Sequence, residues 1–412
     1  MLSKKRFYII TFFFFSFCCV AQQNELTYLN NLIEQNKTII DELVLEKAFQ
    51  KELQKEKSST TKLKVEIIHA TLLADLYYKK VEVLNPKSEA LFKEAILKSV
   101  NDANELAIWT NTQYGFYLYT NSFYRDALPH FLTASRLINK SVPTITIQPA
   151  DVLKKNAFFF GSIEDYDTEA IYLKRALKFT NQKSTDYGTI LNSIGRNYAN
   201  TGNIEAAEKH YNETLRISKI NNDEIRYAKA LGDLATLFDK NKNWEKAEEY
   251  LLKDIAISKE HNGERNTMFA QIQLGNLYYK KNQYEKALQV LNPAEDYAKS
   301  KSNLKGFEEQ IAKLKLAIAI RQNDDKTELQ QRRKLDTLSL FVSQTEGEQV
   351  INKINLETEK ENIKLQLASE KQKVEKQLLV KKIVIIISFI LFAITLLLLI
   401  EYKRRSKQHK IK

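Results

Sequence analysis

Seven polar side chains recur at fixed distances from three small residues in the middle of the chain. The small residues are Gly195, Ala235 and Gly275, and the polar positions lie three residues before, one residue after and five residues after them. The seven side chains are Asn192, Arg196, Asn200, Thr236, Lys240, Asn276 and Lys280. Amides can bond to the backbone of an extended chain, and cations can meet acidic side chains or a terminal carboxylate. The spacing predicts a row of binding groups on successive helices; the alternative is an ordinary water-facing surface.

The three small residues belong to a longer pattern that repeats every 40 residues. Aromatic residues follow them after three positions and alanines after twelve, namely Tyr198, Phe238, Tyr278, Ala207, Ala247 and Ala287. A small residue lets one helix approach the next, the aromatic ring fills the remaining gap, and the alanine lies where the second helix crosses back. A period of this length is typical of solenoids.

These residues resemble the tetratricopeptide repeat, a helical hairpin marked by Leu-Gly, an aromatic residue, and two alanines around a second aromatic. Gly195, Tyr198, Ala207 and Tyr211 fit this pattern, and Gly202 supplies the turn. The chain departs from it in length, since the usual repeat has about 34 residues, and in lacking the family's final proline. The resemblance implies an all-α solenoid of αα-hairpins whose first helices line a groove for a protein or peptide.

Weaker copies of the hairpin extend the predicted array toward the N-terminus. Leu73, Ala74 and Tyr77 occupy the motif positions of one degenerate copy, in which Pro86 stretches the turn. A clearer copy follows around Gly115, which lies 80 residues, or two periods, before Gly195. One further hairpin must therefore lie between these two glycines.

The best candidate for that intervening hairpin places Ala170 three residues out of phase with the other copies. Pro143 and Pro149 predict a loop or bend at residues 141–150 just before it. We expect residues 63–322 to form about five hairpins and a capping helix, because a solenoid needs to cover its last exposed face.

The ends of the chain predict export and membrane anchoring. Residues 1–21 have the basic start, apolar run and small final residue of a secretory signal peptide. Residues 22–62 predict one polar amphipathic N-terminal helix. Residues 383–400 carry no charge, and their length suits a transmembrane helix across a core of about 30 Å. The basic residues of 401–412 indicate a cytoplasmic tail, with the repeats on the periplasmic side.

Between the array and the predicted span, residues 323–382 are highly charged and favour a long helix. Weak heptads within residues 326–382 leave two alternatives open, a coiled coil that makes a homodimer and a single solvated helix. The net charge of +12 is concentrated at the two ends of the chain. We therefore attribute it to membrane topology and expect no nucleic-acid partner.

Residues suited to catalysis or metal binding do not cluster in the sequence. The five histidines are scattered along it, as His69, His130, His210, His261 and His409. Cys18 and Cys19 are the only cysteines and lie in the predicted signal peptide. The chain contains no P-loop and no G-x-S-x-G, H-E-x-x-H or G-x-G-x-x-G motif. We expect a protein that is not an enzyme and holds neither cofactor nor metal.

The order of these segments resembles membrane proteins of Bacteroidetes-type bacteria, in which repeats and a span precede a sensor histidine kinase or a helix-turn-helix regulator. Twelve residues follow the span here, so kinase or transcription activity is not expected. The sequence predicts a membrane-anchored scaffold that binds a protein or peptide on the exported side. The alternative is the sensory half of a split two-component receptor, which acts through a partner kinase or regulator.

Overall fold

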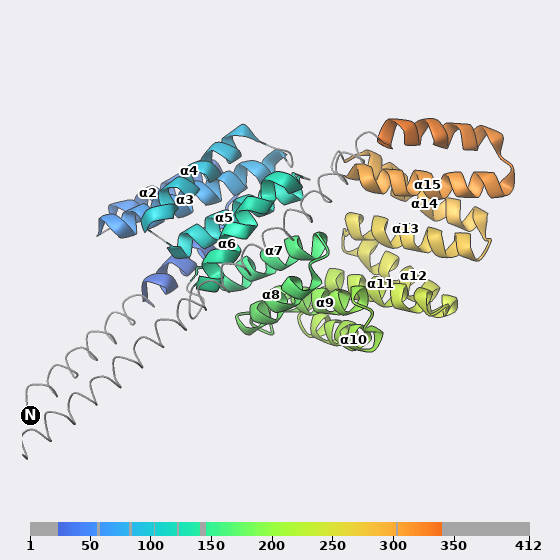
Figure 1. Cartoon of the computed structure of the whole chain (residues 1–412), viewed down its shortest axis with the longest axis horizontal. Helices are drawn as coiled ribbons and strands as arrows, with labels where there is room; N and C mark the ends of the chain where they lie inside the picture. Colours follow the sequence, from blue (N-terminus) through green and yellow to red (C-terminus); the bar gives the residue numbers. More distant parts are fainter. Residues whose placement is uncertain are drawn as a thin grey trace, which may run out of the picture. The chain divides into compact units, whose positions relative to one another are not determined.

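The computed structural model is helical along the residues that it describes (Figure 1). These are residues 24–55, 58–81, 85–102, 104–121, 123–140, 146–301 and 304–339. The chain divides into two compact units, 1–352 and 353–412, and all described residues belong to the first. The all-α prediction is confirmed for these residues, since none of them forms a strand.

Four predicted segments fall outside the described residues, wholly or in large part. They are the signal peptide at 1–21, most of the long helix at 323–382, the span at 383–400 and the tail at 401–412. Among the helices that the structure does describe, none has the length and apolar character needed to cross a membrane.

Within the described residues, twelve consecutive helices pair into six hairpins, whose first members we call A helices and second members B helices. The A and B pairs are α3 (Ser59–Val81) and α4 (Pro86–Asp102), α5 (Asn104–Thr120) and α6 (Tyr124–Lys140), α7 (Pro149–Ser162) and α8 (Tyr166–Lys178), α9 (Thr185–Asn200) and α10 (Ile204–Ile220), α11 (Glu224–Lys240) and α12 (Trp244–Glu260), and α13 (Glu264–Lys280) and α14 (Tyr284–Lys299). The number exceeds the expected five by one. Helix α15 (Lys305–Gln322) follows α14 and packs against it, where the capping helix was expected.

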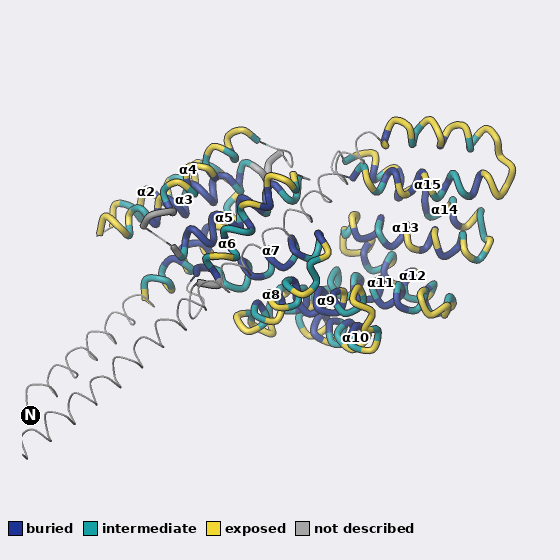
Figure 2. The backbone as a smooth tube through the Cα atoms, in the orientation of Figure 1, coloured by how far each residue is buried: buried dark blue, intermediate teal, exposed yellow. Residues whose placement is uncertain are grey.

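The repeated small residues bring the two helices of a hairpin together. A Cβ atom at Gly195 would lie 2.7 Å from the ring of Tyr211, and one at Gly275 would lie 2.7 Å from Leu291. The rings of Phe238 and Tyr250 meet edge to face at 5.3 Å beside the equivalent contact in α11 and α12. Figure 2 shows the resulting buried residues along each paired helix. The packing roles predicted for the small and aromatic residues are thus confirmed.

Short turns with two recurring features reverse the chain between A and B helices. One residue adopts the left-handed conformation, at Gly202 with φ 83°, Lys242 with φ 58° and Asn282 with φ 57°. In two of these turns the next residue caps helix B: Asn203 accepts a hydrogen bond from the Ala206 amide at 3.1 Å, and Asn243 accepts one from the Lys246 amide at 3.3 Å. These local contacts start the B helix at the same distance after each A helix.

The hairpin of α7 and α8 corrects the predicted phase. In the later hairpins the small residue lies nine positions before helix B begins, and in α7 that position is Ala157, which is fully buried. The position predicted for Ala170 is therefore held by Glu169, one residue earlier. Gly161 makes room for this buried carboxylate, since a Cβ atom there would lie 2.5 Å from it. The turn before α8 is one residue longer than in the other hairpins, which accounts for the shift.

The single helix predicted at residues 22–62 is wrong, because the chain breaks between residues 36 and 42. Residues 24–36 form one helix, and α2 (Glu42–Gln54) begins after Asp41, which accepts a hydrogen bond from the Val44 amide at 3.0 Å. Asp41 is a strong helix-capping residue, and it starts a new helix where apolar spacing alone predicted continuity. The hydroxyl of Tyr28 donates to Glu52 at 3.3 Å and joins the two helices.

Residues 325–339 are helical and are attached to the end of the array by lysine and glutamate side chains. Glu295 of α14 contacts Lys315 at 2.5 Å and also pairs with Lys334, which in turn lies 2.9 Å from Glu308 of α15. Burial alone would raise the pKa of Glu295, but hydrogen bonds from Lys315 and Lys334 lower it to about 2. The start of the predicted long helix is thus fixed to the last helices of the solenoid.

Candidate functional site

A cavity of about 480 Å³ lies on the A-helix side of the array, and we call it the central cavity. Its lining residues are Phe116, Tyr119, Phe158, Thr189, Asn192, Ser193, Arg196, Arg226, Lys229, Gly232, Asp233, Asp254, Asn266, Phe269, Ala270 and Gln273. All of them belong to α5, α7, α9, α11 and α13, except Asp254 of α12. The first helices of the hairpins therefore line the cavity, as the repeat pattern implies.

The lining of the central cavity differs from helix to helix. Helices α5 and α7 supply the aromatic side chains of Phe116, Tyr119 and Phe158. Helix α11 supplies most of the charge, as Arg226, Lys229 and Asp233. An apolar wall beside a few convergent polar groups is the usual composition of a ligand site.

The charged groups of the central cavity are incompletely compensated. Burial raises the pKa of Asp233, although Arg196 and a 2.7 Å hydrogen bond from the Asn192 amide oppose the change. Burial also lowers the pKa of Arg226 and of Lys229, and repulsion between these two cations lowers the pKa of Lys229 further. Both signs of charge are held in a state that they would leave in the absence of a further partner.

Two polar atoms around this cavity are buried without a hydrogen-bond partner in the described part of the chain. One is Asn192 Oδ1, an acceptor, and the other is Arg226 Nε, a donor. Buried polar groups are normally bonded, because leaving one unpaired costs about 1–3 kcal/mol. The central cavity therefore offers both a vacant donor and a vacant acceptor.

The structure brings two of the seven sequence-predicted residues, Asn192 and Arg196, into the central cavity. Thr236 and Asn276 instead line a separate cavity of about 50 Å³. Lys280 pairs with Asp239 of α11 at 2.5 Å. The remaining two, Asn200 and Lys240, are exposed and line neither cavity. A role of the seven residues in binding stays a prediction.

The sequence analysis missed the positions six and two residues before each small residue. These positions supply Thr189, Ser193, Lys229, Asp233, Phe269 and Gln273 to the cavity. Together with the position one residue after, they follow the four- and three-residue steps of one helix face. The offsets chosen from the sequence advanced by four residues each time and drifted off that face. Helical periodicity was the signal that could have found the charged residues of α11.

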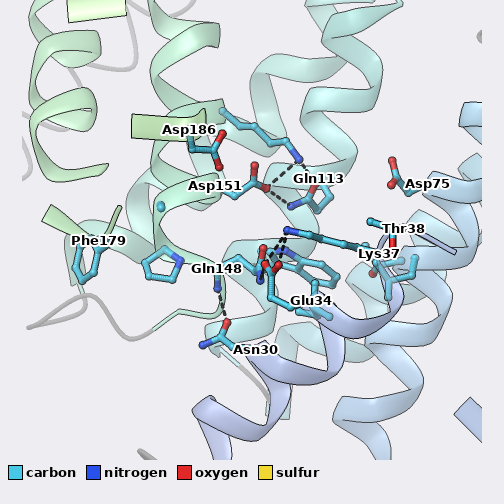
Figure 3. Close-up of a pocket in the computed structure, with 17 residues that line it drawn as sticks. Asn30, Glu34, Lys37, Thr38, Asp75, Gln113, Gln148, Asp151, Phe179 and Asp186 are labelled. Carbon is cyan, nitrogen blue, oxygen red and sulfur yellow. Dashed lines mark hydrogen bonds and ion pairs between the residues drawn. The ribbon is translucent and has the colours of Figure 1, made fainter. Parts of the chain in front are cut away.

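A second cavity of about 620 Å³, the N-terminal cavity, lies between the helix at residues 24–36 and the A helices α3, α5 and α7 (Figure 3). Asn30 Oδ1 accepts a hydrogen bond from the Gln148 backbone amide at 2.8 Å, and Gln148 Nε2 donates to Glu34 at 2.8 Å. Glu34 also pairs with Lys37 at 2.6 Å. These bonds attach the N-terminal helix to the start of α7.

The charges of the N-terminal cavity are matched within the protein. Asp151 pairs with Lys155 at 2.9 Å and with Lys154 at 3.4 Å, and Gln113 Nε2 donates to it at 3.0 Å. Burial would raise the pKa of Asp151, but the two lysines bring it well below its ordinary value. Lys37 and Gln148 likewise lower the pKa of Glu34 against the effect of burial. No described set of three or more His, Cys, Asp or Glu side chains converges as metal ligands would.

Comparisons with known proteins agree with this architecture. Residues 186–260, which span α9 to α12, match the tetratricopeptide repeat. No curated protein matches the chain. The chain is similar to the crystal structure of a Rap protein complexed with competence and sporulation factor, with a TM-score of 0.56 and 17% identity, over 82% of this chain and 92% of that one.

Two structures of NprR are also similar to the chain. The complex of NprR with its cognate peptide NprX gives a TM-score of 0.55 at 13% identity, over 76% of this chain and 88% of that one. The apo form of the quorum sensor NprR from B. thuringiensis gives 0.53 at 13% identity, over 81% and 98%. Similarity at these identities concerns the fold. The described part of the chain is an all-α solenoid with the tetratricopeptide-repeat fold.

Proposed function

We propose that the chain is a non-enzymatic binding protein whose central cavity holds a peptide or an extended segment of a protein. The observation that carries this proposal is the pair of vacant polar atoms, Asn192 Oδ1 and Arg226 Nε. A ligand amide can donate to the first, and a ligand carbonyl or carboxylate can accept from the second. Peptide backbone supplies both groups at every residue.

The aromatic and charged parts of the cavity fit the same ligand. Phe116, Tyr119 and Phe158 provide a surface against which an apolar side chain of the peptide would be buried. Arg196 and Lys229 provide charge for acidic groups. Two of the similar solved structures are complexes, of a Rap protein with competence and sporulation factor and of NprR with its peptide NprX. Those ligands concern those proteins, and they support the same class of ligand here.

Membrane anchoring belongs to this proposal on the strength of the sequence. A signal peptide at 1–21 and a span at 383–400 would place the repeats in the periplasm and residues 401–412 in the cytoplasm. A homodimer through residues 326–382 is the corresponding assembly. Reporter fusions at residue 322 and residue 412 test the topology, since an active exported reporter at 322 and an inactive one at 412 are expected.

A second candidate function, the sensory half of a split receptor, is favoured by the attachment of residues 325–339 to α14 and α15. Lys334 joins these residues to Glu295 and Glu308, so a change in the array on ligand binding would be passed to the chain that follows. Cross-linking in membranes, followed by identification of the captured proteins, distinguishes the two functions. A captured kinase or regulator supports the receptor, and its absence from the captured proteins supports the scaffold.

Peptide capture by the full-length chain tests the central cavity. The chain is incubated with a mixture of short random peptides, and retained peptides are identified by mass spectrometry. The double variant Arg226→Ala/Lys229→Ala is expected to retain at least about tenfold less peptide, because each lost charged hydrogen bond costs roughly 1.5–3 kcal/mol. The control is Lys240→Ala/Lys280→Ala, which removes the same number of cations outside the cavity. Equal losses in both double variants, or no retention by the unmodified chain, would contradict the proposal.

A further inference from the structure

Asp254 reaches the central cavity from the second layer of helices. It lies on the B helix α12, whereas every other lining residue belongs to an A helix. The path runs past Gly232 of α11, where an added Cβ atom would lie 2.5 Å from Asp254 Oδ2. The absence of a side chain at Gly232 thus leaves a window between the cavity and this carboxylate.

The hydrogen bonds of Asp254 leave one of its oxygens toward that window. Oδ1 accepts from Ser258 at 2.9 Å and from Asn266 Nδ2 at 2.5 Å. Both bonds converge on the same oxygen, while Oδ2 is the atom that faces Gly232. The residue is only 2% exposed, so its one accessible oxygen is displayed to the cavity rather than to the open surface.

The surroundings of Asp254 contain too little positive charge for a buried carboxylate. From α11 it faces Asp233 and Lys229, from α13 the neutral Asn266, and from its own helix Ser258. Burial raises the pKa of Asp254 to about 7, Asp233 adds to this effect, and Lys229 opposes it only in part. A cation placed at Oδ2 would supply the missing charge.

We propose that Asp254, displayed to the central cavity through the window at Gly232, is the anchor for a positively charged group of the ligand. The proposal rests on the proposed function and adds a chemical class to it, namely a peptide with a lysine or arginine side chain or a free amino terminus. Asn192 Oδ1 belongs to a residue that is 4% exposed, and it offers a second acceptor in the same cavity. Arg226 and Lys229 would then meet carbonyl or carboxylate groups of that ligand.

Peptide selection by the full-length chain tests this anchor. Two mixtures of short random peptides are offered, identical except that the amino termini are free in one and acetylated in the other. The unmodified chain is expected to enrich peptides that carry lysine, arginine or a free amino terminus. Asp254→Asn keeps the shape of the side chain and is expected to reduce this enrichment at least about tenfold. The control Glu249→Gln removes a carboxylate from the exposed side of α12 and should leave the enrichment unchanged.

Proton release gives a readout that a merely structural role of Asp254 would not produce. Calorimetry with the best-retained basic peptide, in two buffers of different ionisation enthalpy, measures protons exchanged on binding. Near pH 7 the unmodified chain is expected to release up to about half a proton, because the ligand cation favours the ionised carboxylate. Asp254→Asn should release none. Proton uptake would mean that protonated Asp254 donates to the ligand, and it would overturn the cation anchor.

The two proposals fail in different ways. Retention of peptides without any preference for basic groups would overturn the anchor and leave peptide binding in place. Retention of no peptide by the unmodified chain would overturn both.

Discussion

The two cavities on the A-helix side contain the same kinds of charged residue in opposite electrostatic states. In the N-terminal cavity, Lys154 and Lys155 lower the pKa of Asp151 and Lys37 lowers that of Glu34, despite burial. In the central cavity, burial prevails over nearby charge, and the pKa of Asp254 rises to about 7. The first set of charges is paired within the protein, and the second awaits a partner.

This difference separates a structural joint from a candidate binding site more clearly than volume does. The N-terminal cavity is the larger of the two, at about 620 Å³ against about 480 Å³. Its polar groups are nevertheless engaged with one another, and they hold the N-terminal helix on α3, α5 and α7. Perturbed pKa values mark function when no local partner explains them, and stability when one does.

The largest expected effect is on Asp254, where substitution should stabilise the fold. The folded-state pKa of about 7 lies above its ordinary value of 3.8, so the ionised carboxylate destabilises the native state once the pH exceeds the unfolded value. This cost is absent near pH 4, grows as the pH rises, and is complete above pH 7. Asp254→Asn should therefore raise the free energy of unfolding by roughly 3 kcal/mol at about pH 8 and by almost nothing at about pH 4.

Urea unfolding of the full-length chain at the two pH values measures this difference. Glu249→Gln, on the exposed side of the same helix, controls for the general loss of a carboxylate. A destabilised Asp254→Asn chain at pH 8 would show that the carboxylate is already compensated, and the contrast between the cavities would disappear.

Glu295 extends the comparison to a carboxylate outside both cavities. Its pKa of about 2 lies below its ordinary value of 4.5 because Lys315 and Lys334 bond to it. The stabilisation is complete above the unfolded value and is lost as the pH falls toward 2. Glu295→Gln should lower the free energy of unfolding by about 2–3 kcal/mol at neutral pH, since it leaves buried Lys315 short of a counter-charge.

Hydrogen exchange locates the effect of this substitution. Faster exchange is expected in residues 325–339, because they lose one of the two carboxylates that hold Lys334. Unchanged exchange in Glu295→Gln would mean that Glu308 alone attaches this helix.

Asp151 should respond in the opposite direction to Asp254. Asp151→Asn leaves Lys154 and Lys155 without a shared partner, and we expect the free energy of unfolding to fall by about 2 kcal/mol at neutral pH. Because the folded-state pKa is depressed, the loss should shrink as the pH falls below the ordinary range of a carboxyl. Urea unfolding at neutral and acidic pH checks both statements, and stabilisation by the substitution would reverse the assignment of this cavity.

The fold was predictable where local patterns decide it. The 40-residue spacing of Gly195, Ala235 and Gly275 depends on contacts inside each hairpin, and these contacts are present in the structure. The break at Asp41 and the longer turn before α8 were missed because single residues, a helix cap and one inserted turn position, prevail over apolar spacing. Such one-residue changes shift the register of all that follows.

The site was predictable only in part, because it depends on which residues face one another across different helices. The sequence placed Asn192 and Arg196 correctly on the face of α9 that lines the cavity. It could not show that Gly232 would open α11 to Asp254 of the next layer, since these residues are 22 positions apart. Nor could it show that Lys280 would be taken up by Asp239. Pairing between helices, rather than residue type, decides which charges remain available.

The smallest expected effect tests whether the N-terminal cavity is purely structural. Asn30→Ala removes the acceptor of the Gln148 backbone amide, and we expect a loss of about 1 kcal/mol in the free energy of unfolding. Exchange of the Gln148 amide hydrogen should become faster, because Gln148 adopts a left-handed φ of 49° that this bond supports. Peptide capture in the central cavity should stay within about twofold, since 1 kcal/mol of local stability is not spent at the charges that bind. A larger loss of captured peptide would make the N-terminal helix part of the ligand site, and the two cavities would then be one.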